Sequence, residues 1–323
     1  MTSIPVVDLA PYLSDPRGQG LEHVANQVSD ACLDAGAFYL SNHDIASSVP
    51  ASLFAVAQEF FALPEEKKNS IHISNSELHR GYFPVGEESA KGSTVSDLKE
   101  GFDMALELPP EDPDVVAEKP LHGPNTWPTE PVQFRPVLEA YFSEMRRVSE
   151  QLCEIFAYAL GMPTNFLVDR SSKPLAQMRV LRYPPQAPPE QGQQIGAGTH
   201  TDYGVVTLLC QDEVGGLQIR RRDGDWVDVP PQPGMFICHI GDAMERWTNG
   251  TWEATVHRVV NARGRERYSA AFFFDPDYDC LIEPLPQFIE AGSLSKFSPV
   301  TMGEYVTQSF DDTFTYRQEE STT

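Results

Sequence analysis

The sequence predicts a mainly β fold with flanking α-helices, in which an antiparallel sandwich or jelly roll forms the core. The second half of the chain contains many short apolar runs separated by Gly, Pro and Asp turns. Helical periodicity is concentrated in the first half, and strands do not alternate with helices as they would in βαβ units. The predicted strands span residues 205–211, 217–220, 226–229, 235–240, 255–260 and 267–274.

Three helices and one early strand are predicted before these runs. Apolar residues at helical spacing predict helices over 20–36 and 53–61, and Gly36 suits the end of the first. The short apolar run 37–40 predicts a buried strand. A continuous apolar stripe predicts a long helix over 134–161, against which the sheet would pack.

The segments 108–120 and 184–198 are rich in Pro and other breakers and are predicted to be loops. With 41% hydrophobic and 10% aromatic residues, the chain can bury a large core. We expect residues 1–323 to form one unit, with a mixed α/β region over 1–130 and the long helix plus jelly roll over 131–323.

The charge and the cysteines restrict the partners and the compartment. A net charge of −23 argues against binding to nucleic acid or to an anionic membrane. No apolar run approaches the roughly 20 residues that cross a bilayer, and the first residues do not resemble a secretion signal. The five cysteines are widely spaced, so we expect reduced core thiols in a cytoplasmic protein with no obligate protein partner.

Three residues suggest a metal site. His200 and Asp202 are separated by one residue, and alternate residues of an extended strand point to the same face. His257 is a polar residue inside the apolar run 255–260. Two imidazoles and one carboxylate that meet would form a facial triad with open positions, which is typical of non-haem iron(II) oxygenases.

Arg267 and Ser269 suggest an anion site close to that metal. Along 267–274, period-two alternation places Arg267, Ser269, Ala271 and Phe273 on one face of the strand. An arginine within an apolar strand is costly unless it meets an anion, and a guanidinium beside a hydroxyl suits a small dicarboxylate. A structural ion pair is the alternative, but the position ten residues after His257 favours the clamp.

With these motifs in place, the chain resembles the isopenicillin N synthase-like family of iron(II)- and 2-oxoglutarate-dependent dioxygenases over almost its whole length. The diagnostic centre is the HxD at 200–202, a histidine about 55 residues later, and the RxS at 267–269. Further family-like stretches lie at 4–9, 36–43, 123–128, 183–185 and 247–250.

The resemblance implies a distorted double-stranded β-helix (jelly roll) core and the cofactors iron(II), 2-oxoglutarate and O2. It implies that His200, Asp202 and His257 bind the metal, and that Arg267 and Ser269 bind the distal carboxylate of 2-oxoglutarate. It also implies hydroxylation, desaturation or cyclisation at a C–H bond of a small molecule, with release of succinate and CO2, in secondary metabolism.

Other positions match the family pattern less closely. Tyr183 matches a family tyrosine that hydrogen-bonds the co-substrate, whereas Leu181 and His239 stand where relatives often have Asn. We expect His239 to be structural, because the triad is already complete. The candidate substrate contacts are Tyr82, Phe102, Arg179, Arg182 and Phe273, although core packing or a surface charge could equally explain several of them.

Three alternatives stay open. An iron(II) oxidase of the same fold could use Arg267 and Ser269 on its own substrate's carboxylate. A zinc hydrolase could use the same ligands, but no HExxH-like pattern supplies a base. A non-catalytic metal-binding scaffold would not need both the triad and the clamp to stay folded.

Overall fold

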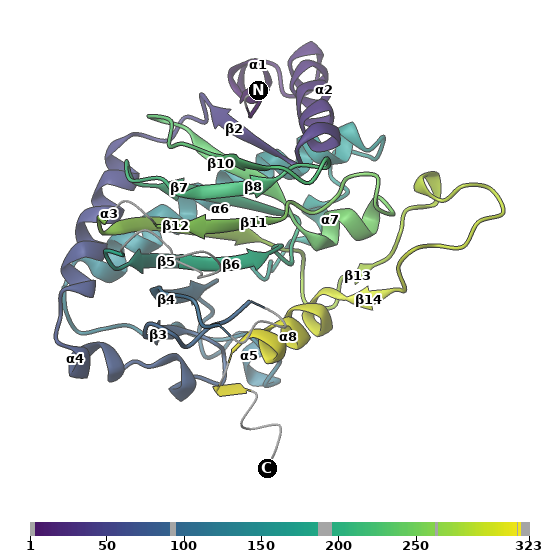
Figure 1. Cartoon of the computed structure of the whole chain (residues 1–323). Coiled ribbons are helices and arrows are strands. Elements are labelled where there is room, and N and C mark those ends of the chain that lie inside the picture. The colour runs from purple at the N-terminus through teal and green to yellow at the C-terminus, as the bar shows by residue number, and fades with distance from the viewer. Residues whose placement is uncertain (1–3, 91–94, 187–195, 262–263, 315, 318–323) are drawn as a thin grey trace.

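The computed structural model describes residues 4–90, 95–186, 196–261, 264–314 and 316–317. Two facing β-sheets form the centre, and the longest helices cover the outer face of the larger sheet (Figure 1). The large sheet has the order β1 (Val6–Asp8), β2 (Ala37–Ser41), β10 (Phe236–Ile240), β7 (Val206–Gln211), β12 (Arg267–Phe274), β5 (Gln177–Tyr183), β4 (Glu100–Ala105) and β3 (Gly81–Phe83). The small sheet has the order β6 (Gly196–His200), β11 (His257–Val260), β8 (Leu217–Arg220) and β9 (Trp226–Asp228).

Strand pairing is antiparallel throughout these two sheets except between β1 and β2, which run parallel. The predicted mainly β fold with a jelly-roll core is therefore confirmed. The third sheet is a short hairpin of β13 (Leu281–Ile282) and β14 (Val300–Thr301) at the edge of the molecule.

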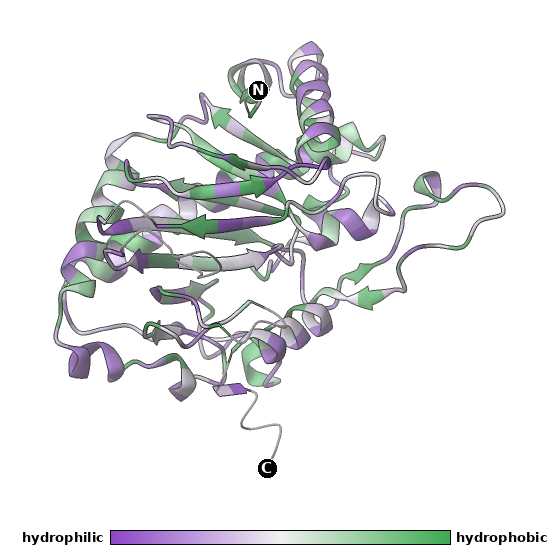
Figure 2. Ribbon diagram, viewed as in Figure 1, coloured by the Kyte–Doolittle hydropathy of each residue, from purple (hydrophilic) through white to green (hydrophobic). Residues whose placement is uncertain are grey.

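The long helix α6 (Phe134–Ala159) lies behind the large sheet in Figure 1 and packs against α2 (Gln19–Asp34) and α3 (Ser48–Phe61). Its apolar stripe faces the sheet. On its outer surface, ion pairs stabilise the helix, such as that between Arg146 Nε and Glu150 Oε1, which are 2.8 Å apart. Figure 2 shows the hydrophobic residues along the central strands and hydrophilic residues over much of α2 and of α4 (Glu65–Asn69). The remaining helices are α1 (Ala10–Ser14), α5 (Pro113–Val116), α7 (Asp242–Trp247) and α8 (Met302–Thr313).

The two faces of the large sheet have different roles because side chains alternate along each strand. On β12, Tyr268, Ala270 and Phe272 enter the core beneath the helices, whereas Ala271 belongs to a second apolar cluster between the two sheets. That second cluster includes Leu181, Leu209 and Ile237 from the large sheet and Leu217, Ile219 and Val259 from the small one. The predicted alternation along 267–274 is thus confirmed, and it places Arg267 between the sheets.

The predicted strands of the second half and the three predicted helices are present, with ends shifted by a few residues at most positions. Helices predominate in the first half, as predicted, and three strands that were not predicted, β1, β3 and β4, also join the large sheet. Of the predicted loop over 184–198, residues 196–198 belong instead to strand β6, and residues 187–195 lie outside the described residues, as do residues 1–3 at the start.

The expected division near residue 130 stays a proposal; strands from both sides of it share the large sheet. Among the described residues, no helix combines the length and apolar character needed to span a membrane.

Candidate active site

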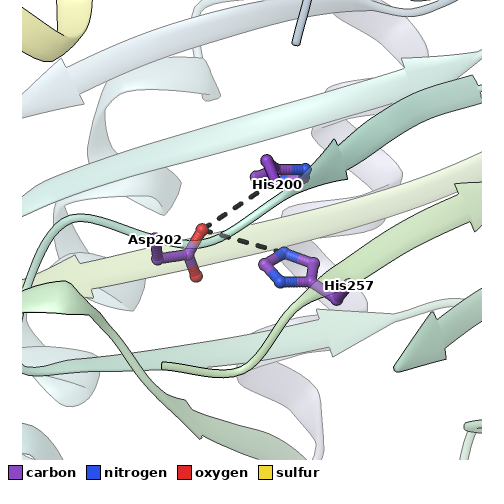
Figure 3. Close-up of side chains that lie close together, drawn as sticks. All are labelled: His200, Asp202 and His257. Carbon is purple, nitrogen blue, oxygen red and sulfur yellow. Dashed lines mark ion pairs between the residues drawn. The ribbon is translucent and has the colours of Figure 1, made fainter. Parts of the chain in front are cut away.

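The three predicted metal ligands converge at one edge of the small sheet. His200 is the last residue of β6 and pairs in register with His257, the first residue of β11. Asp202 lies in the turn after β6, so it reaches the histidines from a turn and not from the strand that the HxD spacing suggested. One ligand atom from each residue lies within 4.8 Å of the other two, and Figure 3 shows the three side chains pointing toward one another.

Hydrogen bonds fix which nitrogen of each histidine faces this point. The Nδ1 of His200 lies 2.7 Å from the carbonyl oxygen of Gly198, and the Nδ1 of His257 lies 3.0 Å from that of Thr255. A carbonyl can only accept, so each Nδ1 carries the hydrogen and each Nε2 keeps a free lone pair. These Nε2 atoms lie 3.8 Å and 3.7 Å from Oδ1 of Asp202. This donor set fits an iron(II) ion.

The charge states suit metal binding. Burial would raise the pKa of Asp202, but the neighbouring imidazoles, led by His257, and a hydrogen bond from Thr207 hold it at about 2. Burial, with the nearby His200 ring, lowers the pKa of His257 to about 3. Near neutral pH the site therefore offers an ionised carboxylate and an unprotonated His257, as metal coordination requires.

The triad opens into a cavity of about 270 Å³ that lies between the sheets and is bounded on one side by α8. Arg267, Ser269, Tyr183 and Phe273 all line this cavity. Arg267 is fully buried, and its guanidinium lies 4.6 Å from the centre of the Tyr183 ring. The strand pairing explains this proximity, because Arg267 on β12 is the direct partner of Tyr183 on β5.

Three protein groups orient the Arg267 guanidinium, but they do not use all of its N–H groups. Its Nε donates to the carbonyl oxygen of Gly215 at 2.6 Å, one Nη1 hydrogen goes to Ser269 Oγ at 2.9 Å, and Nη2 approaches Gln211 Oε1 at 3.4 Å. A guanidinium has five N–H groups, so one hydrogen on each terminal nitrogen remains for a ligand. That pair matches the two oxygens of a carboxylate.

Another wall of the cavity carries a buried ladder of alternating charges. Arg179 binds Asp103 through Nε at 2.8 Å and Nη2 at 2.7 Å, and its Nη1 donates to Glu88 at 2.9 Å. Lys99 then bridges Glu88 at 2.9 Å and Asp97 at 2.6 Å. Three carboxylates therefore surround two cations, which leaves this charge ladder with one negative charge in excess.

Comparisons with known proteins agree with this geometry. Residues 4–130 match the family described as the non-haem dioxygenase in morphine synthesis N-terminal, and residues 175–276 match the 2OG-Fe(II) oxygenase superfamily. The chain is 37% identical over 317 residues to a homoarginine-6-hydroxylase of Oryza sativa subsp. japonica, covering 95% of this chain and 96% of the relative. This chain is a 2-oxoglutarate-dependent iron(II) oxygenase.

Two further comparisons support the same family. The 2-oxoglutarate-dependent dioxygenase citB of Monascus ruber is 35% identical over 290 residues, which cover 87% of each chain. The crystal structure of a full-length Neurospora crassa protein in complex with alpha-KG superposes with a TM-score of 0.81 at 28% identity, covering 94% of this chain and 95% of that one. The predicted class of enzyme and its cofactors, iron(II), 2-oxoglutarate and O2, are therefore confirmed.

Three predicted substrate contacts of this oxygenase lie away from the cavity. Phe102 is fully buried in the core beneath the helices, and Tyr82 lies in the same core with its hydroxyl donating to Glu100 at 2.7 Å. Arg182 forms ion pairs with Glu100 and Glu266. All three side chains project from the face of the large sheet opposite the cavity, so we no longer regard them as substrate contacts.

Arg179 and Phe273 do line the cavity, as predicted, but Arg179 is already engaged by two carboxylates. Sequence reasoning missed Thr207, which lines the cavity, and Gln211, which contacts Arg267. Both are polar residues within the predicted strand 205–211, and their spacing by an even number of positions places them on one face. Glu88 and Lys99 lie between strands β3 and β4, where no periodicity marks them.

Proposed function

We propose that His200, Asp202 and His257 hold the iron(II), and that Arg267 with Ser269 binds the distal carboxylate of 2-oxoglutarate. The observation that carries this proposal is the placement of both groups in one cavity, with the three ligand atoms within 4.8 Å of one another and a buried guanidinium that keeps two N–H groups free. Iron(II), with 2-oxoglutarate and O2, supplies the oxidising chemistry for a substrate C–H bond, and succinate and CO2 are released.

The protein binds the metal and the co-substrate, orients them, and excludes water from the cavity. The backbone carbonyls of Gly198 and Thr255 keep the histidine Nε2 lone pairs directed at the metal position. Leu181, Leu209 and Ala271 give the cavity apolar walls that exclude water around the co-substrate. We assign the Tyr183 hydroxyl a hydrogen bond to 2-oxoglutarate, because its ring lines the same cavity beside Arg267.

The charge ladder supports a substrate that is neutral or cationic. An anionic substrate would meet the carboxylates of Glu88 and Asp97, which line the cavity, together with two cations, Arg179 and Lys99, that carboxylates already engage. A basic amino acid such as homoarginine, which names the rice relative, is therefore the first compound to test. A panel of cationic, neutral and anionic analogues should show substrate-stimulated succinate formation with the first two kinds and little with the third.

We further propose that the enzyme works in the cytoplasm on a free small molecule, with no nucleic acid, membrane or obligate protein partner. All five cysteines are unpaired and four of them are buried, which suits a reducing compartment. The excess of acidic residues opposes binding to phosphate-rich surfaces.

Anaerobic titration of the iron(II)-loaded protein with 2-oxoglutarate tests the cofactor roles. We expect a visible charge-transfer band that saturates with 2-oxoglutarate and that is absent from His200→Ala, a variant expected to fold normally. Failure of the wild-type protein to bind 2-oxoglutarate or to turn it over would refute the proposal. Turnover of a substrate carboxylate without 2-oxoglutarate would indicate the oxidase alternative.

A further inference from the structure

The two oxygens of the Asp202 carboxylate have different surroundings. Oδ1 faces the Nε2 atoms of His200 and His257 at 3.8 Å and 3.7 Å. Oδ2 points the other way, accepts a hydrogen bond from the hydroxyl of Thr207, and lies 3.2 Å from Nδ1 of His239. One oxygen is thus directed at the metal position, while the other is hydrogen-bonded to Thr207 and lies beside His239.

The two groups around Oδ2 come from two neighbouring strands inside the large sheet. Thr207 on β7 and His239 on β10 are direct partners in the antiparallel register, so their side chains project side by side from the large sheet. Both are buried, with exposures of 2% and 1%. Asp202 itself lies in a turn, where the backbone alone does not fix the rotation of a carboxylate.

His239 does not belong to the ligand group. Among the described residues, the only set of three or more possible ligand atoms within 4.8 Å of one another is that of His200, Asp202 and His257. The His239 ring lies 4.5 Å from the His257 ring and lines the cavity, but its Nδ1 faces the oxygen turned away from the two Nε2 atoms. His239 Nδ1 is buried and makes no hydrogen bond in the structure, and Oδ2 of Asp202 is an acceptor that lies 3.2 Å from it.

We propose that His239 and Thr207 are positioning residues that hold Oδ2 of Asp202 and so present a single oxygen, Oδ1, to the metal. This inference rests on the proposed metal site. A carboxylate tied at one oxygen cannot rotate to offer both, which preserves the remaining metal positions for the co-substrate and O2. His239 acts here as a neutral hydrogen-bond donor, a role that a side-chain amide could also fill.

Four variants test the proposal in matched pairs. His239→Leu and Thr207→Val remove the donors, whereas His239→Asn and Thr207→Ser keep one at each position. We measure iron(II) affinity anaerobically by competition with a chromophoric chelator, and the position of the 2-oxoglutarate charge-transfer band in the loaded protein. His23→Leu, a change at an exposed histidine on α2, is the control for loss of an imidazole.

We expect iron(II) to bind about 10–100-fold more weakly to His239→Leu and Thr207→Val, and within about threefold of wild type to the Asn and Ser variants and to the control. A shifted charge-transfer band in the Leu and Val variants would further support a rotated carboxylate, which a merely structural role would not produce.

Unchanged iron affinity and an unchanged band in folded His239→Leu and Thr207→Val would overturn the inference while leaving the proposed function intact. If His239→Leu does not fold, the comparison of Thr207→Val with Thr207→Ser decides. If the wild-type protein binds no iron(II), the proposed function fails first, and this inference fails with it.

Discussion

Replacing Arg267 by lysine should weaken 2-oxoglutarate binding while keeping the positive charge. Arg267 leaves two N–H groups free for a carboxylate once Gly215, Ser269 and Gln211 have taken the others. A lysine ammonium lacks the planar fork and can replace only one of the two contacts with similar geometry.

The magnitude follows from the one contact that is lost. A hydrogen bond to a charged group contributes about 1.5–3 kcal/mol. Because about 1.4 kcal/mol corresponds to a tenfold change in affinity, the Kd for 2-oxoglutarate should rise about 10–100-fold.

The assay is the anaerobic iron(II) titration followed by the charge-transfer band, with thermal unfolding as a check on folding. Arg258→Lys is the matched control, because Arg258 stacks over Trp226 at 4.0 Å and bonds Gln218 outside the cavity. The control should bind 2-oxoglutarate as the wild type does. A folded Arg267→Lys protein with wild-type affinity would refute the clamp, and a loss of affinity equal to that of Arg258→Lys would show a nonspecific effect.

Three further outcomes are expected. Removal of iron with a chelator should abolish 2-oxoglutarate turnover, and added iron(II), but not added zinc, should restore it. Restoration of turnover by zinc would contradict a redox role for the metal. Phe102→Ala should lower the free energy of unfolding by about 3–5 kcal/mol, because the ring is fully buried between Phe60 and Phe134. Unfolding in urea measures this loss, and a loss below about 1 kcal/mol would refute the packing role of Phe102. Burial, then the charge of Asp202, raises the pKa of Asp275 to about 8, above its usual unfolded value near 4. The folded protein thus retains a proton on Asp275 that the unfolded chain releases, so the contribution of Asp275 to stability falls as the pH rises from about 4 to 8. Asp275→Asn should lessen that fall in thermal unfolding of the metal-free protein between pH 5 and pH 8, and equal slopes for the two proteins would contradict it.

Local periodicity was sufficient to predict the long helix and the two faces of the strand that carries Arg267. The stripe along α6 and the alternation along β12 are properties of neighbouring residues, and both are confirmed in the structure. The same alternation placed Arg267 and Ser269 on one face before any strand partner was known. Functional residues that lie close together in the sequence could be recognised in the same way, because the two residues of the HxD motif, and those of the RxS motif, are separated by a single position.

Features that depend on strand pairing could not be read from the chain. Tyr82 and Phe102 were considered for the cavity, but the register of β3 and β4 turns both rings toward the helices. The partnership of Thr207 with His239 exists only because β7 and β10 become neighbours in the sheet.

The sequence by itself determined which residue types are present at the metal site and at the anion site. It also determined the strand face that carries Arg267 and Ser269, the two residues of the anion site. Tertiary structure alone decided that His200 and His257 meet, that Asp202 reaches them from a turn, and that Glu88 and Lys99 form a wall of the cavity. The reason is physical: periodicity orients a side chain relative to its own strand, whereas the distance between two side chains depends on which strands pair and in which register.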